Sequence, residues 1–286
     1  MSLRAEGISI TYESADGRRK RAVSDVDITI ATGEFVSVIG PSGCGKSTLL
    51  HCVGGMLAPT AGRVTLDGAE VREPDPARAA FVFQDYSLYP WKSVLDNAAI
   101  GLRFAGVDRR TRRERAMRQL ELVGLAEVAH SYPSELSGGM QQRVAVARAL
   151  TMEPDILLMD EPFGALDEQS RRRLGVEMSR ILTAAGKTVV MVTHSLDEAV
   201  YWADRVLVLS RGPGRVIQDI RVEGPRPRTL DFMTTPAFDA QRVRLFTLLE
   251  HEYDEAERTA DRPAAEEPPG AGTKLAKDAA ASGGPR

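Results

Sequence analysis

The chain has 286 residues, of which 43% are hydrophobic and 27% charged, and this is ordinary for a soluble globular protein with one large α/β domain or two small ones. Its formal net charge of −3 does not indicate a nucleic-acid partner, and no apolar run is long enough to span a membrane. Because the N-terminus lacks a basic region followed by an apolar core, and Cys44 and Cys52 are the only cysteines, we expect no secretory signal, no structural disulfide and a cytoplasmic location.

The N-terminal residues predict strands. Residues 3–12 and 22–30 alternate in polarity around a turn at 14–18, which indicates an antiparallel pair. Residues 34–39 form a short, mostly apolar run with β-branched side chains, typical of a buried strand. This run leads into a glycine-rich loop and then into a helix.

The glycine-rich loop has the sequence Gly-Pro-Ser-Gly-Cys-Gly-Lys-Ser-Thr at residues 40–48 and matches the phosphate-loop pattern. A strand before it and a helix after it make an anion site, because backbone N–H groups and the helix dipole face the phosphates. Gly43 and Gly45 permit a close approach that a Cβ would obstruct. We expect Lys46 to reach the β- and γ-phosphates and Ser47 to place its hydroxyl on Mg²⁺. The alternative, a chance glycine turn, is disfavoured by the flanking elements.

This loop predicts a run of nucleotide-binding residues. They are Gly40, Pro41, Ser42, Gly43, Cys44, Gly45, Lys46, Ser47 and Thr48. Tyr12, at the end of the first strand, is a candidate platform for stacking adenine, with a half-buried strand tyrosine as the alternative.

The middle of the chain changes from strands to helices. Residues 63–68 and 79–83 predict strands, the second ended by Gln84. From about 87 to 150 the apolar positions follow helical spacing, so we interpret this block as a helical insertion in an α/β core. The charged run at 109–118 predicts a solvated helix face.

Three further apolar strands are predicted at 156–161, 188–193 and 205–209, with a helix at 169–185. Alternating strands and helices indicate a parallel sheet with helices on both faces, in which ligands bind at the carboxyl ends of the strands. The features at such ends are the phosphate loop, Gln84, Asp160 and His194.

The C-terminal part is less regular. Residues 212–228 hold three prolines and three glycines, and 236–253 follow one more helical pattern. From 255 onward the chain is rich in Ala, Pro, Gly and Glu and has no aromatic residue, which predicts a disordered tail.

Together these motifs resemble those of the ABC ATPases, in the same order along residues 3–225. The matching segments are the signature motif at 136–143, the Walker B acids Asp160 and Glu161, the Q-loop Gln84, the D-loop at 165–167 and the switch histidine His194. The resemblance implies an α/β phosphate-loop NTPase with a parallel-sheet core, a small antiparallel β subdomain and an inserted helical subdomain. It implies an ATP-binding domain at 1–235 that includes the insertion at about 87–150. The helical pattern and the composition beyond this domain predict a C-terminal helix at 236–254 and a disordered tail at 255–286.

The resemblance also implies ATP and Mg²⁺ as cofactors. Glu161 would polarise the attacking water, His194 would contact the γ-phosphate and hold Glu161 in line, and Gln84 would sense the ion and the water. Mg²⁺ would be held by Ser47, Gln84 and Asp160. Without the motif order, Glu161 could be a helix-terminal acid and His194 a structural residue.

One set of motifs implies a dimer, because in this family the signature of one subunit caps the γ-phosphate bound by the other. The chain would therefore pair with a copy of itself or with a homologous ATPase subunit. The remaining nucleotide contacts implied by the family are Tyr12, Ser137, Gly138, Gly139 and Asp167.

Transport is the implied function, with closure and opening of the dimer delivered to two membrane permease subunits. Residues 85–91 are the candidate docking loop, with packing onto the core as the alternative. Segments 90–91, 199–205, 214–216 and 225–228 resemble the nitrate, sulfonate and taurine importer branch. The expected protein is peripheral, on the cytoplasmic face of the cell membrane, and works indirectly with a periplasmic or extracellular solute-binding protein, without nucleic acid.

Two other kinds of ABC ATPase are alternatives to an importer subunit. A soluble ABC ATPase acting on DNA or ribosomes would carry long coiled-coil or zinc insertions, or two cassettes, and the sequence has neither. An exporter cassette is often fused to a membrane domain. Solute specificity of an importer would lie in the permease and the binding protein.

Overall fold

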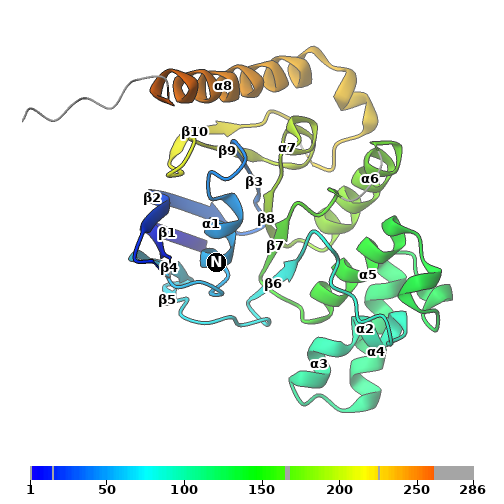
Figure 1. Ribbon diagram of the computed structural model, residues 1–286. Coiled ribbons are helices and arrows are strands. Elements are labelled where there is room, and N and C mark those ends of the chain that lie inside the picture. The colour runs from blue at the N-terminus through cyan, green and yellow to red at the C-terminus, as the bar shows by residue number, and fades with distance from the viewer. Residues whose placement is uncertain (1, 15, 165–167, 225, 261–286) are drawn as a thin grey trace, which may run out of the picture.

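The computed structural model describes residues 2–14, 16–164, 168–224 and 226–260, and these form two sheets with helices around them (Figure 1). The helix α1 (Lys46–Val53) lies between the sheets, where its buried Leu49 and Leu50 belong to a core shared with strands of both. In the described part of the chain, no helix is long and apolar enough to cross a membrane.

The smaller sheet has the strand order β2-β1-β4-β5 and is antiparallel throughout. Its strands are β1 (Ser2–Glu13), β2 (Arg19–Ala31), β4 (Ala61–Leu66) and β5 (Ala69–Glu70). The predicted antiparallel β subdomain is confirmed, and its first two strands extend further at both ends than the alternation of polarity predicts.

The larger sheet has the order β10-β9-β3-β8-β7-β6. Its strands are β3 (Phe35–Ile39), β6 (Ala79–Val82), β7 (Ile156–Asp160), β8 (Thr188–Val192), β9 (Arg205–Leu209) and β10 (Val216–Arg221). All neighbouring pairs are parallel except β10 with β9. The predicted parallel core is therefore confirmed, with an antiparallel edge strand in the Gly- and Pro-rich segment that the sequence did not predict as a strand.

The two faces of this sheet are buried in different cores. Along β3, Phe35 and Ile39 pack on one face, whereas Val36 and Val38 pack on the other with α1 and the small sheet. Because successive strand residues point to opposite faces, a strand buried on both reads as a continuous apolar run. This explains why β3, β7 and β8 were recognisable from sequence.

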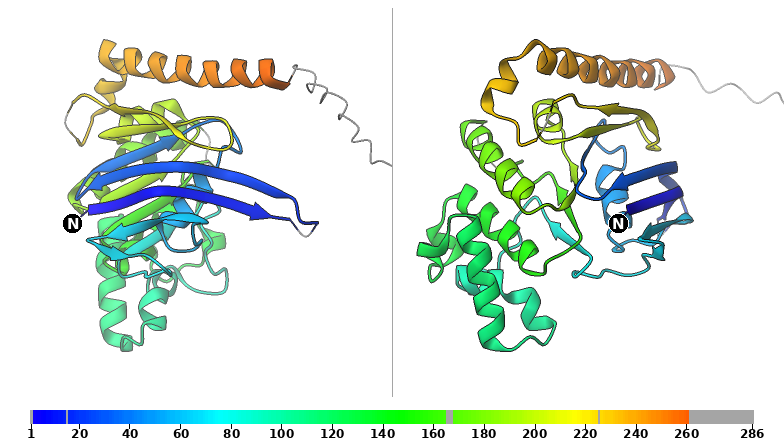
Figure 2. Two further views of the ribbon diagram at one scale, coloured as in Figure 1. Left: turned by 90° about the vertical axis from the view of Figure 1, so that its left-hand side faces the viewer. Right: turned by 180° about the vertical axis from the view of Figure 1, so that it is seen from behind.

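The remaining α-helices lie on the side of the other face and extend away from it, except α8, which runs past the β10 edge of the sheet (Figures 1 and 2). They are α2 (Val94–Ala98), α3 (Ile100–Phe104), α4 (Arg109–Leu122), α5 (Gly138–Thr151), α6 (Glu168–Ala184), α7 (Leu196–Trp202) and α8 (Pro236–Ala260). The helices α2 to α5 group at one end of the molecule and match the helical insertion expected at about 87–150.

The C-terminal helix is longer than predicted. It begins at Pro236, as the pattern indicates, but continues to Ala260, so the expected start of a disordered tail at 255 is wrong for its first residues. Ala, Glu and Arg favour helix, and an established helix propagates through such residues without any apolar stripe to mark them. The rest of the predicted tail lies outside the described residues.

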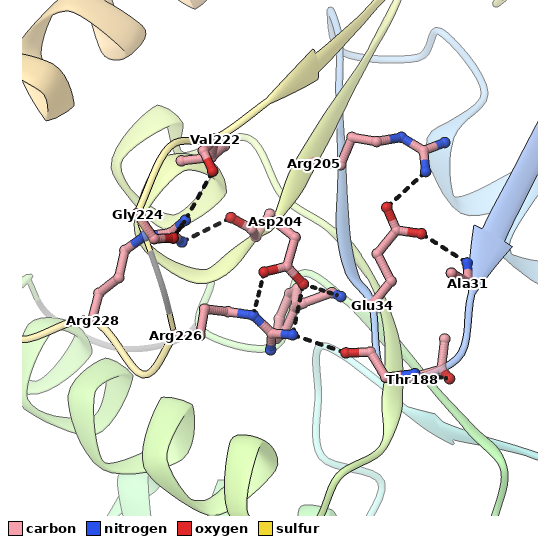
Figure 3. Close-up of polar contacts among 12 residues, drawn as sticks. Ala31, Glu34, Thr188, Asp204, Arg205, Val222, Gly224, Arg226 and Arg228 are labelled. Carbon is pink, nitrogen blue, oxygen red and sulfur yellow. Dashed lines mark hydrogen bonds and ion pairs between the residues drawn. The ribbon is translucent and has the colours of Figure 1, made fainter.

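A buried arginine fastens the segment before α8 to the core (Figure 3). The Arg228 guanidinium donates hydrogen bonds to backbone carbonyls at the end of α7 and in the segment that follows β10: Val200, Tyr201, Ala203, Val222, Glu223 and Gly224. Burial lowers the pKa of Arg228 to about 10. Nearby, Arg226 forms an ion pair with Asp204, whose carboxylate also accepts from the Phe35 amide of β3. These contacts tie the C-terminal extension to the larger sheet.

Candidate active site

The candidate site forms where three parallel strands end together. In the sheet register, Val192 of β8 pairs with Val38 of β3 on one side and with Asp160 of β7 on the other. The phosphate loop follows β3, Glu161 follows β7, and His194 comes two residues after the end of β8. The shared register therefore brings the three predicted groups to one edge of the sheet.

The phosphate loop has the backbone conformation that its glycines predict. Gly43 and Gly45 have φ angles of 74° and 104°, a region that side chains disfavour. At Gly45 a Cβ would also lie 2.6 Å from the Ala22 carbonyl oxygen of β2. The Lys46 ammonium is buried and donates to the carbonyl oxygens of Gly40, at 2.9 Å, and Pro41, at 3.1 Å. Its charge is therefore held within the loop.

The first turn of α1 contacts the end of β7 directly. The Ser47 hydroxyl donates to the Asp160 carboxylate at 2.9 Å, and His51 Nε2 lies 4.0 Å from the other carboxylate oxygen. Burial raises the pKa of Asp160, while the Ser47 hydroxyl and the Lys46 charge act in the opposite direction. Burial removes water from the Asp160 carboxylate, which makes its negative charge unfavourable without a partner. A cation bound between this carboxylate and the Ser47 hydroxyl would compensate that charge.

The Ser47 hydroxyl oxygen and the Asp160 carboxylate oxygen are suitable ligands for Mg²⁺. The ion prefers oxygen ligands and in phosphate sites needs only one or two from the protein, since phosphate and water supply the rest. Among the residues described, no group of three or more His, Cys, Asp or Glu side chains could hold a metal alone. A site on Ser47 and Asp160 would thus be completed by the nucleotide.

Glu161 and His194 face each other beside this pair. His194 Nδ1 lies 3.1 Å from Glu161 Oε2. The Glu161 backbone has a φ of 43°, which is unusual for a residue other than glycine, and its amide donates to the Val192 carbonyl at 2.9 Å. Such strained positions concentrate at functional sites. The pair has the geometry for a carboxylate base oriented by an imidazole.

A cavity of about 390 Å³ adjoins the phosphate loop, the first turn of α1 and Glu161, whereas Asp160 and His194 are not among its lining residues. Its volume is within the usual range for ligand sites. It is lined by Tyr12, Lys20, Ala22, Ser42, Gly43, Gly45, Lys46, Ser47, Thr48 and Glu161. Tyr12 is exposed, and its hydroxyl lies 3.2 Å from Thr48 Oγ1. The exposed ring at the cavity wall supports the adenine-stacking interpretation over that of a half-buried strand residue.

Other predicted residues lie apart from this cavity. Gln84 is exposed in the loop after β6, with its side chain beside Gly164. Ser137 caps α5, and neither it nor Gly138 or Gly139 is among the residues that line the cavity. Asp167 lies outside the described residues. One chain therefore presents a nucleotide cavity and, separately, an exposed signature.

The structure adds residues that sequence reasoning did not identify. Lys20 of β2 lines the cavity, and His51 approaches Asp160. Thr193 and Glu198 form a hydrogen bond next to His194. No motif marks Lys20, whereas the helical spacing of four residues from Ser47 to His51 would have placed both on one helix face.

Comparisons with known proteins show the family of this chain. A family profile described as ABC transporter matches residues 23–164. The taurine import ATP-binding protein TauB of Rhizobium johnstonii is 49% identical over 215 residues, covering 75% of this chain and 82% of that protein. The nitrate import ATP-binding protein NrtD of Synechococcus elongatus is 48% identical over 210 residues, covering 72% and 76%. The dimeric post-hydrolysis structure of the ATP-binding cassette MJ0796, bound to ADP and Pi, superimposes with a TM-score of 0.67 at 34% identity, over 78% of this chain and 100% of that one.

Replacing the buried ammonium tests the phosphate site. Lys46→Ala should weaken ATP binding by roughly 10- to 100-fold, since a charge-assisted contact contributes about 1.5–3 kcal/mol. Lys20→Ala is the matched control, because this exposed lysine lines the same cavity without entering the loop. Calorimetry with Mg²⁺-ATP measures both. Equal affinities for the wild type and Lys46→Ala would contradict the assignment of Lys46.

Proposed function

The chain belongs to the family of ABC transporter ATP-binding subunits, and we propose that within it the protein energises import of a small anionic or zwitterionic solute, such as nitrate, a sulfonate or taurine. It is an ATPase whose hydrolysis of ATP is coupled to transport. The observation that carries the import proposal is the high identity with taurine and nitrate import ATP-binding proteins over most of their length. No specific feature favours a soluble or exporter-associated role.

In the proposed mechanism each side chain has one task. Lys46 binds the β- and γ-phosphates within the loop. Ser47 and Asp160, 2.9 Å apart, would hold Mg²⁺, which neutralises charge on the phosphates when bound. Glu161 accepts a proton from the attacking water, and His194, 3.1 Å from that carboxylate, keeps it oriented. Gln84, in the loop after β6, would respond to the presence of Mg²⁺ and the attacking water.

The exposed signature supports a dimer as the working unit. Ser137, Gly138 and Gly139 stand at the N-terminus of the 14-residue helix α5, where backbone N–H groups and the dipole favour a phosphate. Because they do not line the cavity of their own chain, a second subunit would present them to the nucleotide. The solved relative MJ0796 is described as dimeric. The partner would be a copy or a homologous ATPase subunit.

The loop after Gln84 has one strongly exposed aromatic residue. Trp91 is 71% exposed and packs edge-on against Tyr89, with ring centroids 5.7 Å apart. The fully buried Asn97 fixes this loop by accepting from the Tyr89 amide and donating to the carbonyls of Tyr89, Lys92 and Ser93. A large, rigidly presented aromatic side chain is suited to anchoring a partner, because little conformational freedom is lost on binding.

Not every residue of the predicted docking loop is available. Tyr86 is buried, so the expectation that it contacts a partner is wrong, whereas Leu88 is partly buried and packs against the core. The sequence could not separate the two roles because aromatic and aliphatic residues suit both a core and an interface. Tyr89 and Trp91 remain the candidates for permease docking.

The docking loop is also tied to the signature helix. Arg148 of α5 donates to the carbonyl oxygens of Tyr86, at 2.7 Å, and Ser87, at 2.6 Å. Burial lowers the pKa of Arg148, and nearby acidic groups oppose this. We therefore infer that force applied at the docking loop moves α5, and with it Ser137 and its neighbours, as one unit. This would couple nucleotide-driven closure to two permease subunits at the cytoplasmic face of the membrane, with a solute-binding protein acting indirectly.

Glu161→Gln tests the catalytic assignment. The amide preserves size and can still contact His194, but it cannot accept the proton of water, so ATP should bind while turnover is lost. The variant should then accumulate as a closed dimer. Size-exclusion chromatography with ATP and Mg²⁺, against ADP as control, measures this. A monomer with near wild-type turnover would show that Glu161 is not the base.

Trp91→Ala tests docking. Removing an interface anchor should weaken permease capture by about 30-fold or more, from a cost of about 2 kcal/mol, while ATP affinity stays unchanged. Phe104→Ala is the matched control, since Phe104 is 76% exposed on the same subdomain. A pull-down with the permease and a thermal melt are run on both. Intact capture together with a melting temperature lowered by several degrees would reject docking through Trp91.

The import proposal itself is tested on the assembled transporter. The subunit is co-purified with its permease and binding protein, and ATPase activity is measured with taurine, a longer sulfonate, nitrate and an uncharged sugar. We expect stimulation by one of the anionic or zwitterionic solutes and none by the sugar. Stimulation by the sugar alone would contradict the solute class, and outward movement of solute would contradict import.

A further inference from the structure

Glu198 is a buried acid to which the proposed mechanism gives no task. It stands in the first turn of α7, three residues after the capping residue Ser195, and its side chain is only 11% exposed. This spacing is that of a capping box, in which the glutamate accepts from the backbone amide of the capping residue. The structure shows a different arrangement. The Ser195 amide donates to Thr193 Oγ1 at 3.0 Å, and the Thr193 hydroxyl donates to Glu198 Oε2 at 2.5 Å.

Both neighbours of His194 are thereby attached to Glu198. Thr193 is bound through its hydroxyl to the Glu198 carboxylate, and the Ser195 hydroxyl accepts from the Glu198 amide at 3.3 Å. The Thr193 amide in turn donates to the Val38 carbonyl of β3, at 3.2 Å. The segment that carries His194 is thus held between α7 and the strand that enters the phosphate loop.

The His194 side chain makes few contacts with the rest of the described structure. It is 57% exposed, and within the part of the chain that is described its ring hydrogen-bonds only to Glu161. Whether the imidazole reaches Glu161 therefore depends on where the backbone places it. Because a misplacement of about 1 Å can cost roughly 100-fold in rate, what fixes this backbone matters for catalysis.

We propose that Glu198 is a positioning residue for His194, which it fixes against Glu161 by accepting, through its carboxylate, the hydrogen bond of the preceding residue Thr193. The inference rests on the proposed roles of His194 and Glu161. It assigns to Glu198 no contact with nucleotide or water. Its effect is transmitted through Thr193, whose hydroxyl also accepts from the Ser195 amide on the other side of His194.

The energetics of Glu198 favour this role over simple helix capping. Burial raises the pKa of Glu198, while the Thr193 hydroxyl and the charge of Arg171, whose Nε lies 3.7 Å from Oε1, act against the shift. Burying a carboxylate is costly unless specific partners compensate. Capping alone does not require it, since the Ser195 hydroxyl already accepts from the helix.

The test compares substitutions at neighbouring acids in the soluble subunit. Glu198→Ala should lower kcat by about 10- to 100-fold while KM and the affinity for ATP stay near wild type. Glu198→Gln keeps an acceptor oxygen for Thr193 and should retain most activity. Asp197→Asn is the matched control, because this acid is in the same helical turn and is partly exposed, and its side chain lies 3.9 Å from the Arg242 guanidinium. It should behave as wild type.

Two further variants keep the proposal falsifiable if Glu198→Ala folds poorly. Thr193→Val removes the donor without loss of volume and should reproduce the loss of kcat. When it is combined with Glu198→Ala there should be little further loss, because both act through one hydrogen bond. Wild-type kcat in Thr193→Val, or losses that simply add, would overturn the proposal. A kcat loss in Asp197→Asn equal to that of Glu198→Ala would do the same, since it would indicate a general helix effect.

His194→Ala separates this proposal from the function on which it rests. If His194→Ala loses activity and Glu198→Ala does not, positioning by Glu198 is rejected while the role of His194 stands. If His194→Ala keeps wild-type kcat, both are overturned. Loss in both, with nucleotide affinity preserved, is the result expected.

Discussion

The site depends on the parallel pairing of β3, β8 and β7. Val192 lies between Val38 and Asp160 in the hydrogen-bond register, so the three strands end within a residue or two of one another. Because parallel strands run in one direction, the segments that follow them leave the sheet at the same edge. The phosphate loop, the two acids and the histidine come from parts of the chain far apart in sequence. A register shift in any one strand would move its group away from the other two.

Buried polar contacts at this edge hold the groups in place. Ser47 joins the first turn of α1 to Asp160, and Thr193 joins the end of β8 to Glu198 on α7. Each links the end of one strand, or the residue after it, to a neighbouring helix. Hydrogen bonds of this kind offset the cost of burying carboxylates and restrict the groups to one geometry. Groups held in one geometry by such contacts need less reorganisation in a reaction.

Local patterns predicted the strands and their ends, because a strand buried on both faces is a continuous apolar run and a phosphate loop needs its glycines. They failed where long-range packing decides. β10 forms in a segment rich in Gly and Pro since it can pair with β9 at the sheet edge. Tyr86 is of a residue type that is common at interfaces, but its side chain is buried in the core. Glu198 has the spacing of a capping box, yet its partner is Thr193. The residue types at the site were predictable, whereas the partners of buried polar groups were not.

Under the proposed function, the position of Ser137 outside the cavity has a mechanical consequence. The cavity contains the phosphate loop and Glu161, whereas Ser137 lies at the exposed start of α5. Arg148, on the same helix, binds the carbonyls of Tyr86 and Ser87, and the loop continues to the exposed Trp91, held by Asn97. Charge-assisted hydrogen bonds are stronger than neutral ones, so this connection resists separation. Under the proposed function, closure of two subunits on ATP would move α5 and the docking loop together, and a permease bound at Trp91 would follow.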